Sequence, residues 1–305
     1  MTAQVADMGV LADRGALNSA RLTQDARRES LTFLALCSPG LILVGLIIVL
    51  PIGWLFWLSF FDESGALSGA NYARFFEQRS YVRTFITTFQ VAFLVTGLTV
   101  LIGYPLSYML SQISRRAAAI CMIFVILPFW TSVLVRTYAW LVILQRKGLV
   151  NTWLMDLGVI DQPLPLAHNF TGVIIGMTHI LLPFMVLPLY GSMKSIDTDY
   201  LRAGMNLGAS PTATFWQIFF PLSLPGLAAG IIMVFVLCLG FFVTPALMGG
   251  GNVIMWAMRM EQTTSLYANW GAGSALGVVL LAVTLGLLAL FHRLMGARAT
   301  SVWGG

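Results

Sequence analysis

Long apolar stretches alternate with short polar segments along almost the whole chain. A helix needs about 20 apolar residues to cross the hydrocarbon layer of a membrane. Because a lone strand cannot satisfy its backbone hydrogen bonds in lipid, each stretch of that length predicts a helix. Six such stretches lie at residues 32–60, 84–110, 118–138, 170–192, 223–247 and 271–292. The pattern therefore predicts an all-α integral membrane protein with six transmembrane helices.

These stretches define one predicted transmembrane domain over residues 32–293, flanked by tails at 1–31 and 294–305. The first span is long enough to tilt, or to kink at Pro39 or Pro51. The first tail lacks the short apolar run and cleavage site of a signal peptide.

The first tail also has a pattern of its own. Its leucines are interspersed with arginines and allow an amphipathic helix on the membrane surface; they are Leu11, Leu17 and Leu22.

Composition excludes a water-soluble domain. Of the 305 residues, 58% are hydrophobic and only 10% are charged, against about 25% charged residues in soluble domains. The net charge of +5 is scattered over the ends of the spans, so it does not indicate nucleic-acid binding. Cys37, Cys121 and Cys238 lie in apolar runs without metal-ligand or disulfide spacing, so we interpret them as packing residues.

An even number of spans places both termini on one side of the membrane, and the distribution of Lys and Arg indicates which side. The segments assigned to the inside carry the larger share, and the clearest of them is the short loop Ser111 to Ala117 with Arg115 and Arg116. Cytoplasmic loops carry this excess of positive charge. We therefore expect both termini and the loop 194–221 to be cytoplasmic.

Two segments assigned to the outside are longer than a tight turn requires. Residues 61–83 and 139–169 both mix aromatic with charged residues. Such a mixture is typical of segments that anchor a protein at the membrane surface. The alternative interpretation is a docking face for an external partner, and the sequence leaves both open.

The polar interruption between the fourth and fifth spans carries a helical pattern instead of a simple turn. Residues 200–207 predict a short helix, with Asp197 or Asp199 as its N-terminal cap. Gly208 follows directly and is suited to end that helix in a left-handed turn.

A second helix is predicted after that turn. Ser210 and Pro211 form a typical N-terminus, with Ser as cap and Pro in the first position. We expect Pro221 and Pro225 to interrupt this helix before the fifth span.

This loop resembles the cytoplasmic EAA loop of ABC importer permeases, whose pattern is Glu-Ala-Ala, three residues, Gly, nine residues, then Ile-x-Leu-Pro. Matching residues at the same spacing are Ala203, Gly208, Ile218 and Pro221. Departures are Arg202 for Glu, Gly204 for the second Ala and Phe220 for Leu. The resemblance implies a type I ABC importer permease fold in the bacterial inner membrane, with the loop as a coupling helix that enters a cleft on a cytoplasmic ATPase subunit.

The coupling residues that the resemblance implies are Asp199, Leu201, Arg202, Ala203, Gly204, Met205, Leu207, Gly208, Ala209, Ile218 and Pro221. Arg202 reverses the charge of the family's Glu, so the matching ATPase is expected to offer an acidic group there.

The segment Leu127 to Asn151 resembles the polyamine-type branch of these permeases, as in spermidine/putrescine importers. The shared residues are Pro128, Phe129, Trp130, Arg136, Tyr138, Ala139, Trp140, Gly148 and Asn151. The resemblance implies a second permease subunit, two ATPase copies and an external binding protein as partners. It implies a polyamine substrate, with opines, phosphonates or iron complexes as alternatives.

A cation crossing a membrane favours carboxylates or aromatic faces, and the six predicted spans contain no Asp or Glu. Candidate pathway or gate residues are therefore the aromatics Phe129, Trp130, Tyr138 and Trp140, which could equally be packing or lipid-facing residues. Any carboxylates would come from the partner permease. Arg136 would repel a cation, so we expect it to reach the membrane interface or to pair with an acid in an external loop.

The chain lacks the Gly-x4-Gly-Lys-Ser/Thr loop that cradles nucleotide phosphates. We therefore expect no catalysis, cofactor or metal on this chain, and ATP and Mg on the partner ATPase.

Two alternatives fit less well. An ion-coupled carrier would need ionisable groups at the membrane centre, and a rhomboid-type protease would need Ser before His. Here His179 precedes Ser274, so we interpret His179 as a packed, hydrogen-bonded residue.

Overall fold

The computed structural model describes residues 2–62 and 65–303, and toward both chain ends it describes the helical backbone alone. The chain divides into two units, Met1–Trp57 and Leu58–Gly305. The first unit consists of helix α1, whose bounds are Thr2–Leu58. This helix covers the predicted first span and continues through Pro39 and Pro51 without a break. The side chains of Leu11, Leu17 and Leu22, on which the predicted amphipathic face depends, lie outside the described part.

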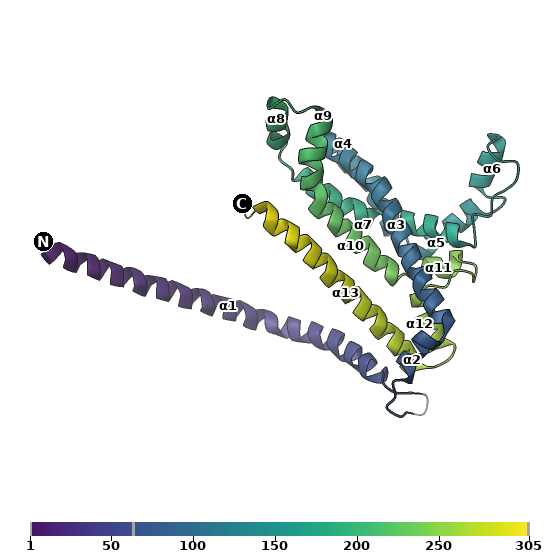
Figure 1. Ribbon diagram of the computed structural model, residues 1–305, viewed down its shortest axis with the longest axis horizontal. Coiled ribbons are helices and arrows are strands. Elements are labelled where there is room, and N and C mark those ends of the chain that lie inside the picture. The colour runs from purple at the N-terminus through teal and green to yellow at the C-terminus, as the bar shows by residue number, and fades with distance from the viewer. Residues whose placement is uncertain (1, 63–64, 304–305) are drawn as a thin grey trace. The chain divides into compact units, whose positions relative to one another are not determined.

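The second unit is built from helices that differ greatly in length (Figure 1). They are α2 (Ala70–Glu77), α3 (Arg79–Gln112), α4 (Arg115–Ile126), the 3-10 helix η1 (Leu127–Trp130), α5 (Val133–Leu144), α6 (Leu149–Asp156), α7 (Phe170–Lys194), α8 (Thr198–Asn206), α9 (Pro211–Thr214), the π-helix η2 (Phe215–Phe219), α10 (Phe220–Leu239), α11 (Val243–Met248), α12 (Trp256–Ser265) and α13 (Trp270–Trp303).

The predicted all-α class is confirmed. Within residues 2–62 and 65–303 the only extended pairing is an isolated bridge between Phe61 and Leu67. Five of the described helices are long and apolar enough to cross a membrane, and a bent pair of helices makes a sixth candidate span.

Helices α3, α7 and α10 pack against one another more extensively than any other elements and form the centre of the second unit. Their buried side chains include Val91 and Val95 of α3, Met177 and Met185 of α7, and Phe235 of α10. Helix α12 packs on α13, and the short α11 packs on α5. Because lipid removes the hydrophobic drive between helices, close van der Waals packing has to hold this core together.

Two glycines make the close contact between α7 and α10 possible. A Cβ atom at Gly226 would lie 2.3 Å from Cβ of Ser192 and 3.0 Å from the carbonyl oxygen of Pro188. A Cβ atom at Gly230 would lie 2.7 Å from Sδ of Met185. The two glycines are four residues apart and share one helix face, which is the small-xxx-small arrangement of closely packed membrane helices. We call the contact of Gly226 and Gly230 with α7 the glycine seam.

The third predicted span, 118–138, is wrong as a single straight helix. Arg115–Trp130 and Val133–Asp156 are bent by 100° at a short break. The chain tightens into η1 at Pro128, which has no N–H to continue an α-helix. Thr131 then becomes extended, and both its N–H and its hydroxyl donate to the carbonyl of Pro128, at 3.1 and 2.7 Å. Local side-chain bonding of this kind replaces the helical ladder and turns the chain.

The predicted fifth span, 223–247, also needs correction. The apolar helix runs from Pro211 to Leu239, so it starts and ends earlier than predicted. Pro221 and Pro225 do not interrupt it. A π-turn precedes Pro221, in which the N–H of Phe220 bonds to the carbonyl of Phe215, five residues back. We attribute the continuity to this wide turn, which relieves the crowding that a proline ring causes one turn earlier.

Both stretches assigned to the outside are ordered by buried asparagines. Asn71 donates to the carbonyls of Ser59 and Phe61, at 3.1 and 2.8 Å. Asn151 donates to the carbonyls of Gln145 and Leu164, both at 3.0 Å, and accepts from the N–H of Leu164 at 2.8 Å. Asn151, one of the residues shared with the polyamine-type branch, therefore has a structural role here.

We predict that Gly226→Val destabilises the protein by about 1–3 kcal/mol, because the added side chain overpacks the glycine seam. Gly286→Val on α13 is the matched control, since a Cβ atom there meets nothing within 4 Å. The measurement is the thermal unfolding of both variants in lipid nanodiscs. Equal unfolding temperatures would show that the seam is not tight.

Candidate coupling site

Helix α8 begins where the sequence predicted a cap. The side chain of Asp197 accepts a hydrogen bond from the N–H of Asp199 at 2.9 Å, and helical residues follow from Thr198. Asp199 lies in the first turn, where its negative charge interacts favourably with the helix dipole. Of the two proposed caps, Asp197 is therefore the one that the structure uses.

The end of α8 is a Schellman motif centred on Gly208. Its φ is 88°, in the left-handed region. The N–H of Gly208 donates to the carbonyl of Met205 at 2.9 Å, and the N–H of Ala209 donates to the carbonyl of Gly204 at 3.1 Å. This pair of bonds satisfies the last carbonyls of the helix. The predicted left-handed stop is confirmed.

The second helix starts two residues later, as predicted. The side chain of Ser210 accepts from the N–H of Ala213 at 3.2 Å, and Pro211 occupies the first turn. Since this helix continues as η2 and α10 into the membrane, the turn at Gly208 is directly joined to a long helix. Figure 1 shows α8 and α9 together at one end of the second unit.

The side chains of α8 divide into an inward and an outward face. Leu201 packs against the small core of Leu189, Met193 and Phe219, and Gly204 is buried. The outward face is formed by Tyr200 and Ala203 of α8 and by Leu207 at its C-terminal cap, which recur at helical spacing, and Leu207 is 90% exposed. Met205 and Pro221 are also exposed, whereas Ala209 and Ile218 are half-buried.

Gly204 allows α8 to fold closely against the second helix. A Cβ atom at this position would lie 2.5 Å from Cδ1 of Ile218. The close approach at Gly204 is therefore made within the loop itself.

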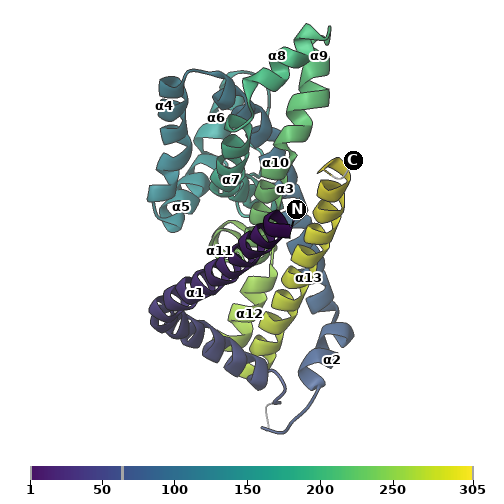
Figure 2. The ribbon, with the colours of Figure 1, turned by 90° about the vertical axis from the view of Figure 1, so that its left-hand side faces the viewer.

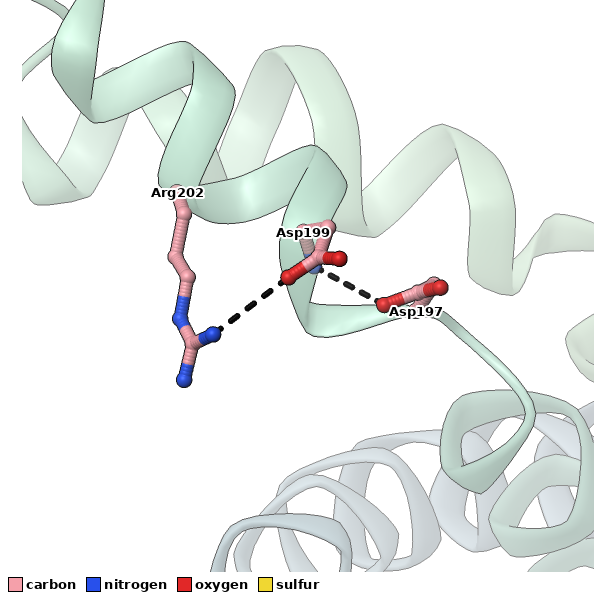
Figure 3. Close-up of polar contacts among 3 residues, drawn as sticks. All are labelled: Asp197, Asp199 and Arg202. Carbon is pink, nitrogen blue, oxygen red and sulfur yellow. Dashed lines mark hydrogen bonds and ion pairs between the residues drawn. The ribbon is translucent and has the colours of Figure 1, made fainter.

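Arg202 points outward and is paired on its own helix. Its Nη1 lies 3.3 Å from Oδ1 of Asp199, and both side chains are well exposed (Figure 3). Exposed pairs of this kind contribute little to stability. Both groups therefore remain available to an external partner.

An aromatic cluster that the sequence analysis missed ties the loop to α3. Tyr108 packs edge-on against Phe215 and Phe219, with ring centroids 5.2 and 5.1 Å apart. The hydroxyl groups of Tyr104 and Ser223 are hydrogen-bonded at 2.9 Å. The sequence feature that could have predicted this cluster is the dense run of aromatic residues around η2. The cluster therefore packs η2, which continues α9, against α3.

The base of the loop is fixed at the same end of the unit. Nζ of Lys194 donates to the carbonyl of Ser111 at 3.2 Å. The loops at Ser111 to Ala117 and at 194–221, both predicted to be inside, therefore lie at one end of the unit.

The four candidate pathway aromatics do not converge on one point. Phe129 and Trp130 are exposed on η1 and line an apolar cavity of about 470 Å³ with Phe184. Trp140 is half-buried on the other arm of the bend and packs edge-on against His179, with ring centroids 5.4 Å apart. Tyr138 is exposed on α5.

Two polar residues in the spans differ from expectation. Arg136 was expected at the interface or in an ion pair, but it is only 8% exposed. Its Nε and Nη1 are buried and make no hydrogen bond to any described residue. His179 was expected to be hydrogen-bonded, but its buried Nδ1 likewise has no partner in the described part of the chain.

The second unit is a bundle of candidate membrane-spanning helices with a capped helix–turn–helix at one end, and the family that its sequence matches makes it a membrane transport protein. The family of binding-protein-dependent transport system inner membrane components matches residues 100–300, more than half of the chain. The chain belongs to this family. It is accordingly an inner-membrane permease component with several membrane-spanning helices.

Individual proteins of similar sequence are also membrane permeases. The chain is 33% identical over 223 residues to the spermidine/putrescine transport system permease protein PotB of Haemophilus influenzae, covering 73% of this chain and 78% of the relative. It is 30% identical over 245 residues to the inner membrane ABC transporter permease protein YdcU of Escherichia coli, covering 76% and 77%.

A solved structure shows the same fold. A chain of the bacterial alginate ABC transporter, in complex with an alginate pentasaccharide-bound periplasmic protein, superposes with a TM-score of 0.71 at 18% identity. The match covers 92% of this chain and 98% of that one.

We predict that Gly208→Ala weakens the loop by about 1–2 kcal/mol, because an L-residue is strained in the left-handed region. Gly204→Ala should cost less, since the flexible end of Ile218 can rotate away and alanine favours the helix. Gly191→Ala, where a Cβ atom meets nothing within 4 Å, is the control. Limited proteolysis of the loop measures the effect. Equal cleavage rates in all three variants would contradict the assignment of the turn.

Proposed function

We propose that this chain is one of two permease subunits in an importer driven by a partner ATPase, and that loop 194–221 contacts this ATPase. The observation that carries the proposal is the outward face of α8. Its large exposed side chains lie on a helix that is capped at both ends and held from behind by Leu201 and Gly204. A rigid helix presenting apolar side chains suits insertion into a groove of another protein.

Energy has to come from outside the chain in this proposal. The sequence contains no phosphate-cradling loop. ATP and Mg are accordingly assigned to the partner ATPase, and the permease itself binds no cofactor and catalyses no reaction. Closure of an ATPase dimer would push α8, and the helix Pro211–Leu239 would carry that movement into the membrane.

The proposed assembly has a second, different permease subunit, two ATPase copies and an external binding protein. Support for the binding protein comes from the fold match, because the alginate transporter was solved with its periplasmic protein bound. At the end of the unit away from α8, a cavity of about 690 Å³ is lined by Arg74, Tyr81 and Arg259. This cavity is the surface that we assign to the binding protein.

Sidedness follows from the same arrangement. The paired arginines Arg115 and Arg116 begin α4, close in sequence to Ser111 at the end of α3, whose carbonyl Lys194 contacts. A positive short loop at the end that carries α8 supports a cytoplasmic position for this end and for both termini.

The proposed substrate is a polyamine such as putrescine or spermidine. Similarity to a spermidine/putrescine permease supports it, and so does the aromatic lining of the cavity at Phe129 and Trp130, because aromatic faces attract cations. Opines, phosphonates and iron complexes are the alternative substrates of the same importer class.

Uptake by the complete transporter in proteoliposomes tests this function. We expect labelled spermidine to enter only with ATP inside and the binding protein outside. Leu207→Asp should abolish uptake and weaken ATPase binding about 10- to 100-fold, which corresponds to the burial energy of one leucine. Leu157→Asp is the matched control, since Leu157 is 76% exposed at the C-terminal cap of α6.

Two results would contradict the proposal. Normal ATPase binding by Leu207→Asp would remove α8 from the contact. Uptake of an opine, phosphonate or iron complex but not of spermidine would refute the polyamine and leave the importer class intact.

A further inference from the structure

One face of α3 carries a row of exposed residues that starts with charged side chains and becomes apolar along the helix. The row consists of Arg79, Arg83, Ile86, Gln90 and Leu94, which recur every three or four residues and therefore share one helix face. We call this row the α3 stripe. Its charged end adjoins α2 and α12, and Figure 2 shows these two helices at the end of the second unit opposite to α8 and α9.

The charged end of the α3 stripe opens into two polar hollows. One, of about 300 Å³, is lined by Arg83 and Arg259 together with the hydroxyl groups of Ser80 and Thr87. The other, of about 480 Å³, shares Arg83 and Thr87 with the first and adds Arg79. Among the described residues, neither lining contains an Asp or Glu. Three guanidinium groups thus meet beside neutral hydrogen-bonding groups.

No carboxylate of the described chain neutralises these arginines. The guanidinium groups of Arg79, Arg83 and Arg259 form no hydrogen bond or ion pair with any residue that the structure describes. Arg259 is half-buried, and its guanidinium carbon lies 5.4 Å from the centroid of the Tyr81 ring. Arg79 and Arg83 are exposed. Arginines in this state are suited to bind a phosphate group, whose oxygens accept from the guanidinium fork.

Beyond the arginines, the α3 stripe borders an apolar groove of about 700 Å³. Phe89 and Phe93 of α3 line it together with Phe170 at the start of α7. Gln90 is the one polar residue among the described residues of this lining, and it also lines the hollow at Arg79. The apolar groove and the charged hollows are therefore continuous.

The length of this continuous surface matches one leaflet of a membrane. Arg83 and Phe93 are separated by about 15 Å along the helix axis at 1.5 Å per residue. The hydrocarbon core of a bilayer is about 30 Å thick, so one acyl chain extends through about 15 Å of it. A phosphate site followed by an apolar groove of this length fits the headgroup and one acyl chain of a phospholipid.

We propose that the α3 stripe binds one anionic phospholipid, with its phosphate at Arg83 and Arg259 and an acyl chain along Phe89 and Phe93. Basic pockets beside membrane helices bind anionic lipid headgroups in this way. A zwitterionic headgroup fits less well, because its ammonium group adds positive charge beside the arginines. An acidic side chain of a water-soluble protein satisfies the arginines but leaves the apolar groove uncovered.

The test of the headgroup site is native mass spectrometry of the full-length chain in detergent, titrated with dimyristoyl phosphatidylglycerol. One lipid should bind per chain, about ten-fold more tightly than dimyristoyl phosphatidylcholine. Arg83→Gln should weaken binding of phosphatidylglycerol about ten-fold, because it removes charge-assisted hydrogen bonds. Arg146→Gln is the matched control, since it removes the same charge at an exposed position just after α5, and it should bind as wild type.

A second pair of variants tests the acyl chain. Leu94 is 48% exposed and lines the groove, so Leu94→Ala should weaken binding of dimyristoyl phosphatidylglycerol about five-fold, the burial energy of about half a leucine side chain. It should leave binding of the short dihexanoyl form unchanged. Leu101→Ala is the control, because Leu101 is exposed on the same helix but does not line the groove.

Three outcomes would overturn the lipid site. The first is equal binding of phosphatidylglycerol and phosphatidylcholine, or wild-type binding by Arg83→Gln. The second is binding of glycerol phosphate as tight as that of the lipid, which would make the arginines a site for a soluble anion. The third is displacement of the lipid when the second permease is co-purified, because the stripe would then be a subunit interface. The lipid titration requires no ATPase, binding protein or transported substrate, so failure of the proposed function would leave its result unchanged.

Discussion

The glycine seam between α7 and α10 is the contact on which the rest of the structure depends. Gly226 and Gly230 bring the backbone of α10 against Ser192 and Met185 of α7, closer than any larger residue would allow. The same helix continues through η2 to Pro211, so it reaches from the loop into the centre of the bundle. In the proposed function, a push on the loop would therefore reach the packed core, because close-packed interiors transmit strain.

Charged side chains at the loop are exposed, whereas the charged side chain on α5 is buried. At the end that carries the loop, Asp199 and Arg202 remain exposed, and their pairing contributes little to stability. On α5, Arg136 is buried, and its Nε and Nη1 make no hydrogen bond to described residues. The exposed apolar face of α8 is explained by the proposed contact with a partner ATPase.

The sequence was sufficient for the features that local chemistry decides. The cap of α8, the left-handed stop at Gly208 and the start at Ser210 each depend on a few adjacent residues. The stop and the start were predicted correctly, and Asp197 was one of the two caps that the sequence offered. Most span positions followed from hydropathy. The bend at Thr131 was missed because a window of hydropathy does not register a side chain that bonds to the backbone. Pro221 led to a wrong prediction of a break in the helix, because the sequence pattern did not reveal the π-turn that accommodates this proline.

The sequence alone did not predict the tertiary surroundings of individual side chains. Arg136 was expected to reach the interface because a long side chain near the end of a predicted span usually does so. The bend placed it elsewhere, on a helix packed against α7 and α11. The aromatic cluster of Tyr108 with Phe215 was missed for a related reason, because residues far apart in the chain meet only after the helices have packed.

Cross-linking of α8 to the ATPase tests the central claim most directly. One cysteine replaces Leu207 in a background in which the native Cys37, Cys121 and Cys238 are all changed to Ser. Cysteines are then placed one at a time along the groove of the ATPase subunit. We predict a disulfide between the two chains at one groove position, with a yield that changes when ATP closes the ATPase dimer. Absence of a cross-link at every groove position, or labelling of the new cysteine only from outside the cell, would contradict the account.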